Sequence, residues 1–514
     1  MNLTQNYYEY EQGTADIIVK GRLFDSYDFW KEINAYPFIL DVIKNGYKIP
    51  FYSTPPSVFL PNNRSSLNHG DFVESAIHDL LVRGLVIECS SRPIVVNPLT
   101  VSIQSNGKKR LILDLRHVNK HLWKSSIKFE DIRTAMYFLK QGDFCFKFDL
   151  TSAYHHISIF EPHTLYLGFS WRFGDKVRFF RFQVLPFGLS SAAYIFTKLT
   201  RPLIKKWRSE GKQVLMYLDD GFGRHSSYDK CLQVAMEIKQ DLIKSGFVPK
   251  VEKSMWNPST EAVFLGYHLN LSTGIISIPE RRLHKIRQTI GHTHASLQKS
   301  EKVHVRLVAS LVGQIISMSF VTGNVVYIMT KCLSYDILQA VSWNESISLS
   351  KDCMKQIEFW QTNLDKVIKR NFILDHSVHT VVYSDASGTG FGGYTVDNPM
   401  NISHGMWDEE ESCKSSTWRE LVAVQRVFVS LLPFLEGKTI KWFSDNKNVV
   451  SIVEKGSMKT DLQNIAINIF DMCLANSISL HTEWVPRSEN VIADEISRLV
   501  DHDEWLYPTV FLNL

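Results

Sequence analysis

The chain has 514 residues, of which 44% are hydrophobic, and a net charge of +4 at neutral pH. This apolar content excludes a chain that is disordered throughout, and the length predicts about three or four domains. The seven cysteines are scattered and form no CxxC pair, which argues against a disulfide framework or a structural zinc site. They favour a reducing intracellular setting, cytoplasm or nucleus, and the polar start MNLTQNYYEYEQ does not resemble a signal peptide.

Charge is distributed unevenly along the chain. Residues 1–374 carry a net charge of +14, whereas residues 375–514 carry −10. The basic part predicts a polyanionic partner such as nucleic acid. The acidic part can act on the same partner if metal ions mediate the contact.

After an irregular, aromatic-rich N-terminal extension, the first half of the chain alternates strands and helices. Apolar periodicity predicts helices over 71–85, 128–141, 190–210 and 227–245, and strands over 95–103, 110–115 and 144–150. One hairpin is expected at the turn Gln104–Gly107 and a second within VLMYLDDGFG, Val214–Gly223. This order indicates an α+β sheet layer with helices on one face.

The second half begins with a mostly helical stretch over residues 281–370. Within it, Leu307–Met329 lacks charged residues and is long enough to span a membrane, but Gln314, Asn324 and two glycines favour a buried helix pair. No membrane association is therefore expected. A second α/β domain follows, with strands over 381–387, 391–396 and 439–445 and helices over 417–435, 446–455 and 490–499.

Two adjacent aspartates, Asp219 and Asp220, interrupt an apolar run in which an uncompensated carboxylate is costly. Asp149 ends the strand FCFKFD, and if the two strands are neighbours, Asp149 and Asp219 meet at one sheet edge. Carboxylates gathered in this way bind hard divalent cations, and Mg²⁺ is the usual choice beside phosphate. Asp-Asp-Gly alone is also a common turn, so the surrounding residues decide between the two interpretations.

Five blocks surround these aspartates. They are KKRLILDLRHVNKH (108–121), FDLTSAYHH (148–156), VLPFGLSSAAYIF (184–196), YLDDGFG (217–223) and VFLGYHLN (263–270). In order and spacing, residues 85–275 resemble reverse transcriptases.

The resemblance implies a role for each matching position. Asp149, Asp219 and Asp220 match the catalytic aspartates that hold two Mg²⁺ ions, with Mn²⁺ as an acceptable substitute. Arg110 matches the arginine that holds the incoming dNTP, and Tyr154 the bulky residue that excludes a ribose 2′-OH. Phe187 and Gly188 match the turn of the nucleotide pocket, and the primer-grip hairpin is matched by Leu265, Gly266 and Tyr267. Arg116 and Asn119 also suit triphosphate oxygens, whereas His155 and His156 depart from the pattern and receive no role.

A second set of carboxylates lies in the C-terminal α/β domain. Asp385 and Asp445 are expected at strand ends, Glu420 at the first turn of a helix and Asp494 inside the last helix. Over residues 378–500 these four resemble the two-metal site of ribonuclease H, which implies that they hold Mg²⁺. The loop before Asp494, where that family often has a histidine, reads PRSEN with Arg487, while His481 stands upstream on an expected strand.

The N-terminal segment indicates the kind of genetic element. Residues 25–56 resemble the segment before the polymerase in tyrosine-recombinase retrotransposons of the DIRS type, and an LTR-type element is the alternative. The matching residues are Trp30, Ile39, Gly46, Tyr47, Ile49, Phe51 and Pro55. The chain shows neither an Asp-Thr/Ser-Gly protease motif nor a His-His-Cys-Cys integrase site, so other parts of a retroelement polyprotein are expected as partners.

The sequence thus predicts an α+β multidomain protein with a right-hand polymerase of fingers, palm and helical thumb, followed by an α/β ribonuclease H-like domain. The expected parts are an N-terminal extension (1–60), fingers and palm (61–275), thumb or connection (276–374), ribonuclease H-like domain (375–500) and tail (501–514).

The expected function is RNA-directed DNA synthesis in a retrotransposon, with degradation of the RNA strand of the hybrid. RNA template, DNA primer, RNA–DNA hybrid and dNTPs are the expected partners. The alternative is a catalytically idle, domesticated nucleic-acid-binding protein, which has no reason to keep seven unpaired acids. Tyr154 and the second carboxylate set argue against an RNA-directed RNA polymerase, and Ala386 in DASGTG excludes an aspartic protease.

Overall fold

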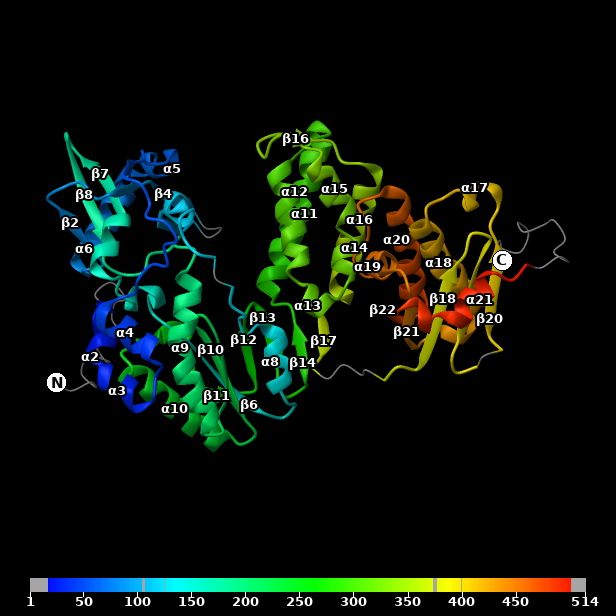
Figure 1. The fold of residues 1–514 in the computed structure, drawn as a ribbon, viewed down its shortest axis with the longest axis horizontal. Coiled ribbons are helices and arrows are strands. Elements are labelled where there is room, and N and C mark those ends of the chain that lie inside the picture. The colour runs from blue at the N-terminus through cyan, green and yellow to red at the C-terminus, as the bar shows by residue number, and fades with distance from the viewer. Residues whose placement is uncertain (1–16, 104–106, 125, 373–376, 399, 501–514) are drawn as a thin grey trace. The chain divides into compact units, whose positions relative to one another are not determined.

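The computed structural model describes residues 17–103, 107–124, 126–372, 377–398 and 400–500. The chain forms two compact units, Met1–Gly274 and Ile275–Leu514 (Figure 1). Most of the turn expected at Gln104–Gly107, and the tail expected over 501–514, lie outside the described residues.

A four-stranded antiparallel sheet forms the centre of the first unit. Its strand order is β11-β6-β10-β9, with bounds Met255–Ser259, Phe144–Asp149, Asp220–His225 and Gln213–Tyr217. Helices α9 (Ala192–Ser209) and α10 (Tyr228–Lys244) pack on it, so the two helices expected here are confirmed to within about two residues (Figure 1). Phe148 and Trp207, both fully buried, pack edge to face between sheet and helix.

The β9–β10 hairpin differs from expectation in its glycine. The sequence suggested that Gly221 permits the turn, but the turn is made by Leu218 and Asp219, and Leu218 takes the left-handed conformation at φ 54°. Gly221 lies inside β10, where a Cβ atom would stand 2.1 Å from the Phe148 ring. The glycine is needed for close packing beside the aspartates, not for the turn.

A second sheet has the order β1-β3-β7-β8-β2, with bounds Val58–Phe59, Val95–Asn97, Gly168–Phe173, Lys176–Phe182 and Val86–Cys89. The single strand expected over 95–103 is wrong, because it breaks at Pro98. The first part, β3, pairs with β7, whereas β4 (Leu99–Ile103) forms a hairpin with β5 (Lys109–Leu113). Proline lacks the N–H that a continuous strand requires.

Helices in the first unit also differ in extent from the sequence predictions. Helix α6 (Gly70–Val82) agrees with expectation, whereas α8 (Ile132–Phe138) is shorter, since the Asp131 side chain accepts a hydrogen bond from Thr134 N and caps its start. The described part of the N-terminal extension, residues 17–60, is not irregular. It contains α2 (Arg22–Asp25), α3 (Tyr27–Glu32) and α4 (Pro37–Asn45).

Trp30 of α3 explains why the extension is ordered. Its ring is fully buried against Phe247, and its indole N–H donates to the Ser245 carbonyl at 2.9 Å.

The remaining elements of this unit are short. They are α5 (Arg64–Leu67), α7 (Arg116–Asn119), 3₁₀ turns at Ala153–His156, Glu161–Tyr166 and Val251–Lys253, and the hairpin β12 (Glu261–Phe264) with β13 (Tyr267–Asn270).

The second unit begins with the expected helical stretch. Its helices are α11 (Glu280–Ser300), α12 (Val305–Ile316), α13 (Ser319–Thr322), α14 (Val325–Ile328), α15 (Lys331–Leu338) and α16 (Lys351–Asn363). The uncharged segment 307–329 thus divides into three helices, and within the described part of the chain no helix has the length and apolarity needed to cross a membrane. Two short strand pairs frame the helices: β14 (Ile275–Ser277) with β17 (Lys369–Asn371), and β15 (Val303–His304) with β16 (Ser346–Ile347).

A five-stranded mixed sheet follows, in the order β20-β19-β18-β21-β22. The bounds are Ile402–Met406, Gly390–Thr395, Thr380–Ala386, Thr439–Ser444 and Ser479–Trp484. Strands β18, β19 and β20 are antiparallel, whereas β18, β21 and β22 are parallel. The expected strands of this domain and the position of His481 on a strand, β22, are confirmed.

Helices cover both faces of this sheet. The helices of this domain are α17 (Glu409–Ser412), α18 (Ser416–Leu435), α19 (Lys447–Lys455), α20 (Thr460–Ala475) and α21 (Val491–Ser497), of which α17 and α20 were not predicted. A Cβ on Gly393 would meet Val427 of α18, whereas one on the adjacent Gly392 would meet Ser497 of α21. Because successive residues of a strand face opposite sides, α18 and α21 pack on opposite faces.

Replacing Gly221 by Ala is expected to destabilise the first unit by about 1–3 kcal/mol, because the added methyl group overlaps the buried Phe148 ring. Gly70→Ala is the matched control, since a Cβ there meets only Trp171 at 3.8 Å. Urea denaturation followed by tryptophan fluorescence measures both variants. Equal unfolding midpoints for the two would contradict the packing described for Gly221.

Candidate functional site

The ends of β6 and β10 bring two aspartates directly opposite each other. Asp149 and Asp220 are partners in the antiparallel register, so their side chains lie on the same face of the sheet. Asp219 stands in the adjoining turn, where its carbonyl accepts from Leu150 N at 3.2 Å. The sequence analysis expected Asp149 and Asp219 to meet at one sheet edge. In the structure, the residue directly opposite Asp149 is Asp220, and Asp219 lies in the turn just before it.

These three carboxylates repel one another in a half-buried site. Burial raises the pKa of both Asp219 and Asp220, and the charge of Asp149 raises both further. One cation offsets part of the charge: Lys253 Nζ lies 3.0 Å from Asp149 Oδ2. Burial opposes the charge on Lys253, but its pKa is raised overall by the hydrogen bond to Asp149 and by the neighbouring carboxylates. The sequence analysis missed Lys253, which stands in no quoted block.

A pocket of about 550 Å³ opens at this edge. Its lining includes Asp149, Asp220 and Lys253 together with Leu265 and Gly266 from the β12–β13 turn. Both turn residues have positive φ, 48° for Leu265 and 77° for Gly266, as a two-residue hairpin of this twist requires. The next predicted residue, Tyr267, is buried at the start of β13. The hairpin and the aspartates therefore share one cavity.

The predicted nucleotide-pocket residues form a group of their own. The Tyr154 ring contacts Phe187 and Phe196 at centroid distances of 5.4 and 5.5 Å, and burial and then Asp219 raise its pKa. Phe187 is 50% exposed, which is unusual for so large an apolar ring. Gly188 has φ 108°, and a Cβ there would stand 2.5 Å from the Leu113 carbonyl oxygen, so glycine is required.

Two of the residues suggested for triphosphate binding instead hold protein groups. The Asn119 side chain donates to the Gly188 carbonyl and accepts from Ser190 N, both at 2.9 Å, so it fixes the pocket turn. Arg116 pairs with Asp114, with Nη2 to Oδ2 at 2.6 Å. Arg110 lies exposed on β5 opposite Ser102 and is not among the residues that line the carboxylate pocket.

His155 and His156, to which the sequence assigned no role, are buried beside this group. Burial lowers their pKa values to about 4 and about 3, so both are neutral near pH 7.

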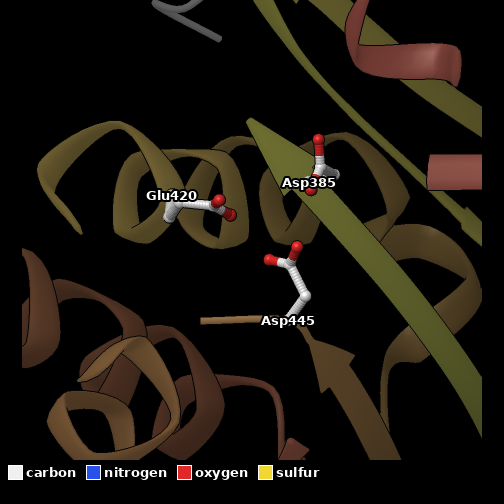
Figure 2. Close-up of side chains that lie close together, drawn as sticks. All are labelled: Asp385, Glu420 and Asp445. Carbon is white, nitrogen blue, oxygen red and sulfur yellow. The ribbon is translucent and has the colours of Figure 1, made fainter. Parts of the chain in front are cut away.

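A second carboxylate cluster lies on the mixed sheet of the other unit. Asp385 near the end of β18, Glu420 on α18 and Asp445 after β21 bring one carboxylate oxygen each within 4.8 Å of one another. Figure 2 shows the three side chains converging on one space from two strands and a helix. Ser415 caps the start of α18 by accepting from Trp418 N, which sets Glu420 near the first turn.

This cluster is more deeply buried than the first. Burial, together with the charge of neighbouring carboxylates, raises the pKa of Glu420 to about 9 and that of Asp385 to about 6. Burial also raises the pKa of Asp445. One Glu420 oxygen, Oε2, is buried with no hydrogen-bond partner in the described structure. Three carboxylates with an unsatisfied oxygen form the donor set that a hard divalent cation prefers.

Asp494 is not one of the three converging carboxylates. It pairs with Arg487 and with Arg498, at 2.8 and 2.9 Å. The Arg498 hydrogen bond, with Arg487 adding to it, lowers its pKa to about 2. Arg487, from the loop before Asp494, thus helps to neutralise that carboxylate.

Two polar residues that the sequence analysis missed hold Asp385 in place. Ser497 Oγ donates to Asp385 Oδ2 at 2.9 Å, and Asn490 Nδ2 donates to Asp385 Oδ1 at 3.3 Å and to the Ser384 carbonyl at 3.1 Å. Asn490 and Ser497 lie at the two ends of α21, which docks against the glycines of β19. Their ordinary residue types gave no signal in the sequence.

Comparison with known proteins bears on the first site. Residues 96–269 match the family model described as reverse transcriptase (RNA-dependent DNA polymerase), a range that contains Asp149, Asp219 and Asp220. This segment is therefore similar to reverse transcriptase domains.

Relatives of the chain are distant and longer. It is 20% identical to the Transposon Tf2-3 polyprotein of Schizosaccharomyces pombe over 92% of this chain and 33% of that protein. It is 22% identical to the retrovirus-related Pol polyprotein from transposon opus of Drosophila melanogaster, over 83% and 42%. A putative enzymatic polyprotein of Cassava vein mosaic virus is also 22% identical, over 80% and 61%. The chain thus spans about one third to three fifths of these relatives.

Solved structures are similar to this chain in fold. The foamy viral protease-reverse transcriptase in complex with dsDNA has a TM-score of 0.50 and 17% identity, covering 89% of this chain and 96% of that one. The same enzyme in complex with an RNA/DNA hybrid has a TM-score of 0.50 and 16% identity, covering 89% and 62%.

The free energy of unfolding in metal-free buffer is expected to fall as pH rises from about 5 to 9. Folded Asp385 and Glu420 have raised pKa values, so the folded state binds protons that the unfolded chain has already lost, and this stabilisation disappears as pH passes the folded values. Glu420→Gln is expected to flatten this decline and to be more stable than the parent chain at pH 9.

Glu436→Gln, at an exposed carboxylate just after the same helix, is the control and should leave the pH profile unchanged. The measurement is thermal denaturation at several pH values in the presence of a chelator. Parallel profiles for the parent chain and Glu420→Gln would contradict the burial of an uncompensated carboxyl group.

Proposed function

We propose that the chain is an RNA-directed DNA polymerase with a fused ribonuclease H activity, encoded by a retrotransposon. The observation that carries the proposal is the pairing of Asp149 with Asp220 beside Asp219, at one open edge of a reverse transcriptase domain. The first unit then supplies the fingers and palm, and the second a helical thumb or connection followed by the ribonuclease H-like domain.

The first pocket fits divalent cations by its donor chemistry. It offers three carboxylates, and in the described structure the ion pair of Lys253 is with one of them, Asp149. Asp149, Asp219 and Asp220 would hold Mg²⁺, or Mn²⁺ in its place, and two such ions would supply electrostatic stabilisation for in-line nucleotidyl transfer. The β12–β13 turn, Leu265–Gly266, lines the same pocket and would position the primer strand.

The aromatic group beside the pocket would select the sugar. Tyr154 is held between Phe187 and Phe196, so its ring cannot move away from an incoming nucleotide without disrupting this packing. A ribose 2′-OH would meet the ring, whereas a deoxyribose would fit. Asn119 stabilises the turn at Gly188, next to Phe187, by donating a hydrogen bond to the Gly188 carbonyl. Arg110 would contact the triphosphate.

The second cluster supports cleavage of RNA in a hybrid. Asp385, Glu420 and Asp445 converge with an unsatisfied Glu420 oxygen, which fits a cation-binding site of the same carboxylate chemistry. Asp494, paired with Arg487 and Arg498, would lie beside the three converging carboxylates and would not be one of the principal ligands. In the mixed sheet, β18 is antiparallel to β19 and parallel to β21, which is in turn parallel to β22. This sheet, with helices on both faces, is consistent with a ribonuclease H-like domain.

The proposed partners are an RNA template, a DNA primer, their hybrid and dNTPs. The solved foamy viral enzymes were captured with dsDNA and with an RNA/DNA hybrid, which makes these the first ligands to test. The basic part, residues 1–374 with a net charge of +14, suits the phosphate backbone.

We further propose that the element is of the DIRS type, on the matches between Trp30 and Pro55 given above, with an LTR-type element as the alternative. Trp30, Ile39, Tyr47 and Ile49 are all buried, so these matches belong to the packing of the extension. The reading frames flanking the gene test this directly. A tyrosine recombinase supports the proposal, whereas an integrase with a His-His-Cys-Cys site overturns it.

Asp149→Asn and Asp220→Asn are each expected to lower primer extension on an RNA template by at least about a hundredfold, because each removes a carboxylate charge that would hold the Mg²⁺ ions needed to stabilise the transferred phosphate. Binding of primer–template should change little, since the basic surface remains. Asp229→Asn, at an exposed residue on α10, is the control. Extension within tenfold of the parent chain by either site variant would contradict the assignment.

Asp445→Asn is expected to stop cleavage of the RNA strand in a labelled hybrid while sparing primer extension by the same preparation. The reason is that Asp445 belongs to the carboxylate cluster of the second unit and does not line the pocket of the first unit. Asp461→Asn, exposed on α20, serves as the control. Wild-type cleavage would place the nuclease site elsewhere, and loss of both activities would show that the two sites depend on each other.

A further inference from the structure

A groove separate from the carboxylate pocket lies between the start of α4 and helix α9. Its volume is about 890 Å³, and we call it the α9 groove. Tyr36 and Phe38 line it from the N-terminal extension, and Lys198, Arg201 and Lys205 from α9. None of its lining residues also lines the pocket of Asp149 and Asp220, and the sequence analysis assigned no function to it.

The groove is basic. Lys198, Arg201 and Lys205 recur at intervals of three and four residues, so they lie on one face of α9 on successive turns. Lys128 adds a fourth cation to the lining. Across the part of the chain that the structure describes, none of these four forms an ion pair with a carboxylate. They are therefore available to an anionic ligand.

The acidic side chain in the groove lining does not offset this charge. Glu130 forms an ion pair with Arg208, in which Nη1 lies 2.8 Å from Oε1. It also accepts a hydrogen bond from Met216 N at 3.2 Å. Its negative charge is thus already neutralised. Among the described residues that line the groove, the four cations therefore face no carboxylate other than Glu130, which is already paired.

Two large rings are exposed in the same groove. Tyr36 is 55% and Phe38 49% exposed, although they flank Pro37 at the first turn of α4. The ammonium group of Lys205 lies 5.6 Å from the centre of the Tyr36 ring. Exposed rings interleaved with cations provide stacking surfaces beside phosphate contacts, which is the combination that binds unpaired nucleic acid strands.

We propose that the α9 groove is an accessory binding site for single-stranded nucleic acid. The cations contact the phosphates, and Tyr36 and Phe38 stack on unpaired bases. A duplex presents no free base faces, and a purely acidic peptide has no group that stacks, so either would use the cations and leave both rings in water. The site goes beyond the proposed polymerase and nuclease activities and does not require either of them.

The test uses the full chain with its main cleft already occupied by an excess of unlabelled blunt hairpin duplex. A fluorescent single-stranded RNA of about 12 nucleotides is then titrated, and its anisotropy measures binding outside that cleft. Lys205→Glu and Tyr36→Ala are expected to weaken binding by about tenfold or more each. Lys230→Glu, an equal charge change at an exposed residue of α10, is the matched control and should retain binding.

A second measurement locates the ligand. The same RNA carrying 4-thiouridine is photo-crosslinked, and the linked peptides are identified by mass spectrometry, with crosslinks expected at residues 36–38 or 197–205. Equal weakening by Lys230→Glu, undiminished binding by Tyr36→Ala, or crosslinks only elsewhere would each overturn the proposal. So would a self-association that Lys205→Glu abolishes while RNA binding persists. Primer extension by the same preparations reports separately on the polymerase activity.

Discussion

Mutual repulsion between half-buried carboxylates is the interaction on which both candidate sites depend. In the first, Asp149, Asp219 and Asp220 share one sheet edge with Lys253 as the cation in contact, and in the second, Asp385, Glu420 and Asp445 converge with an unsatisfied oxygen. Burying such charge destabilises a fold unless cations compensate it. Such destabilising clusters occur at two places, at the strand ends of two separate sheets. This is the pattern expected where clustered charge serves a chemical function.

The packing around each cluster supplies the stability that repulsion removes. At the first site, Gly221 allows the Phe148 ring to lie against β10, and this ring joins the sheet to Trp207 of α9. At the second, α21 docks on the glycines of β19 and directs Ser497 toward Asp385. Rigid secondary structure therefore fixes the positions of the acids, and they cannot move apart to relieve their repulsion.

Strong periodicity made much of the fold predictable. Helices α9 and α10 and the strands bearing Asp149 and Asp385 were found from apolar spacing, because long amphipathic segments have one stable burial pattern. Local exceptions were not predictable: Pro98 divides one expected strand between two sheets, and Trp30 orders an extension that seemed irregular. Residues recognised only by contact, such as Lys253, Asn490 and Ser497, carry no motif, and Asp494 proved to be neutralised by two arginines.

The most direct test of the central claim is to replace Mg²⁺ by Fe²⁺ and generate hydroxyl radicals with ascorbate and peroxide, which cut the backbone beside bound metal. The account predicts two groups of cuts, one near residues 149 and 219–220 and the other near 385, 420 and 445, both suppressed by excess Mg²⁺. Cuts scattered over exposed acidic segments such as 408–411, or no cuts near either cluster, would show that these carboxylates are not held for metal and would contradict the account.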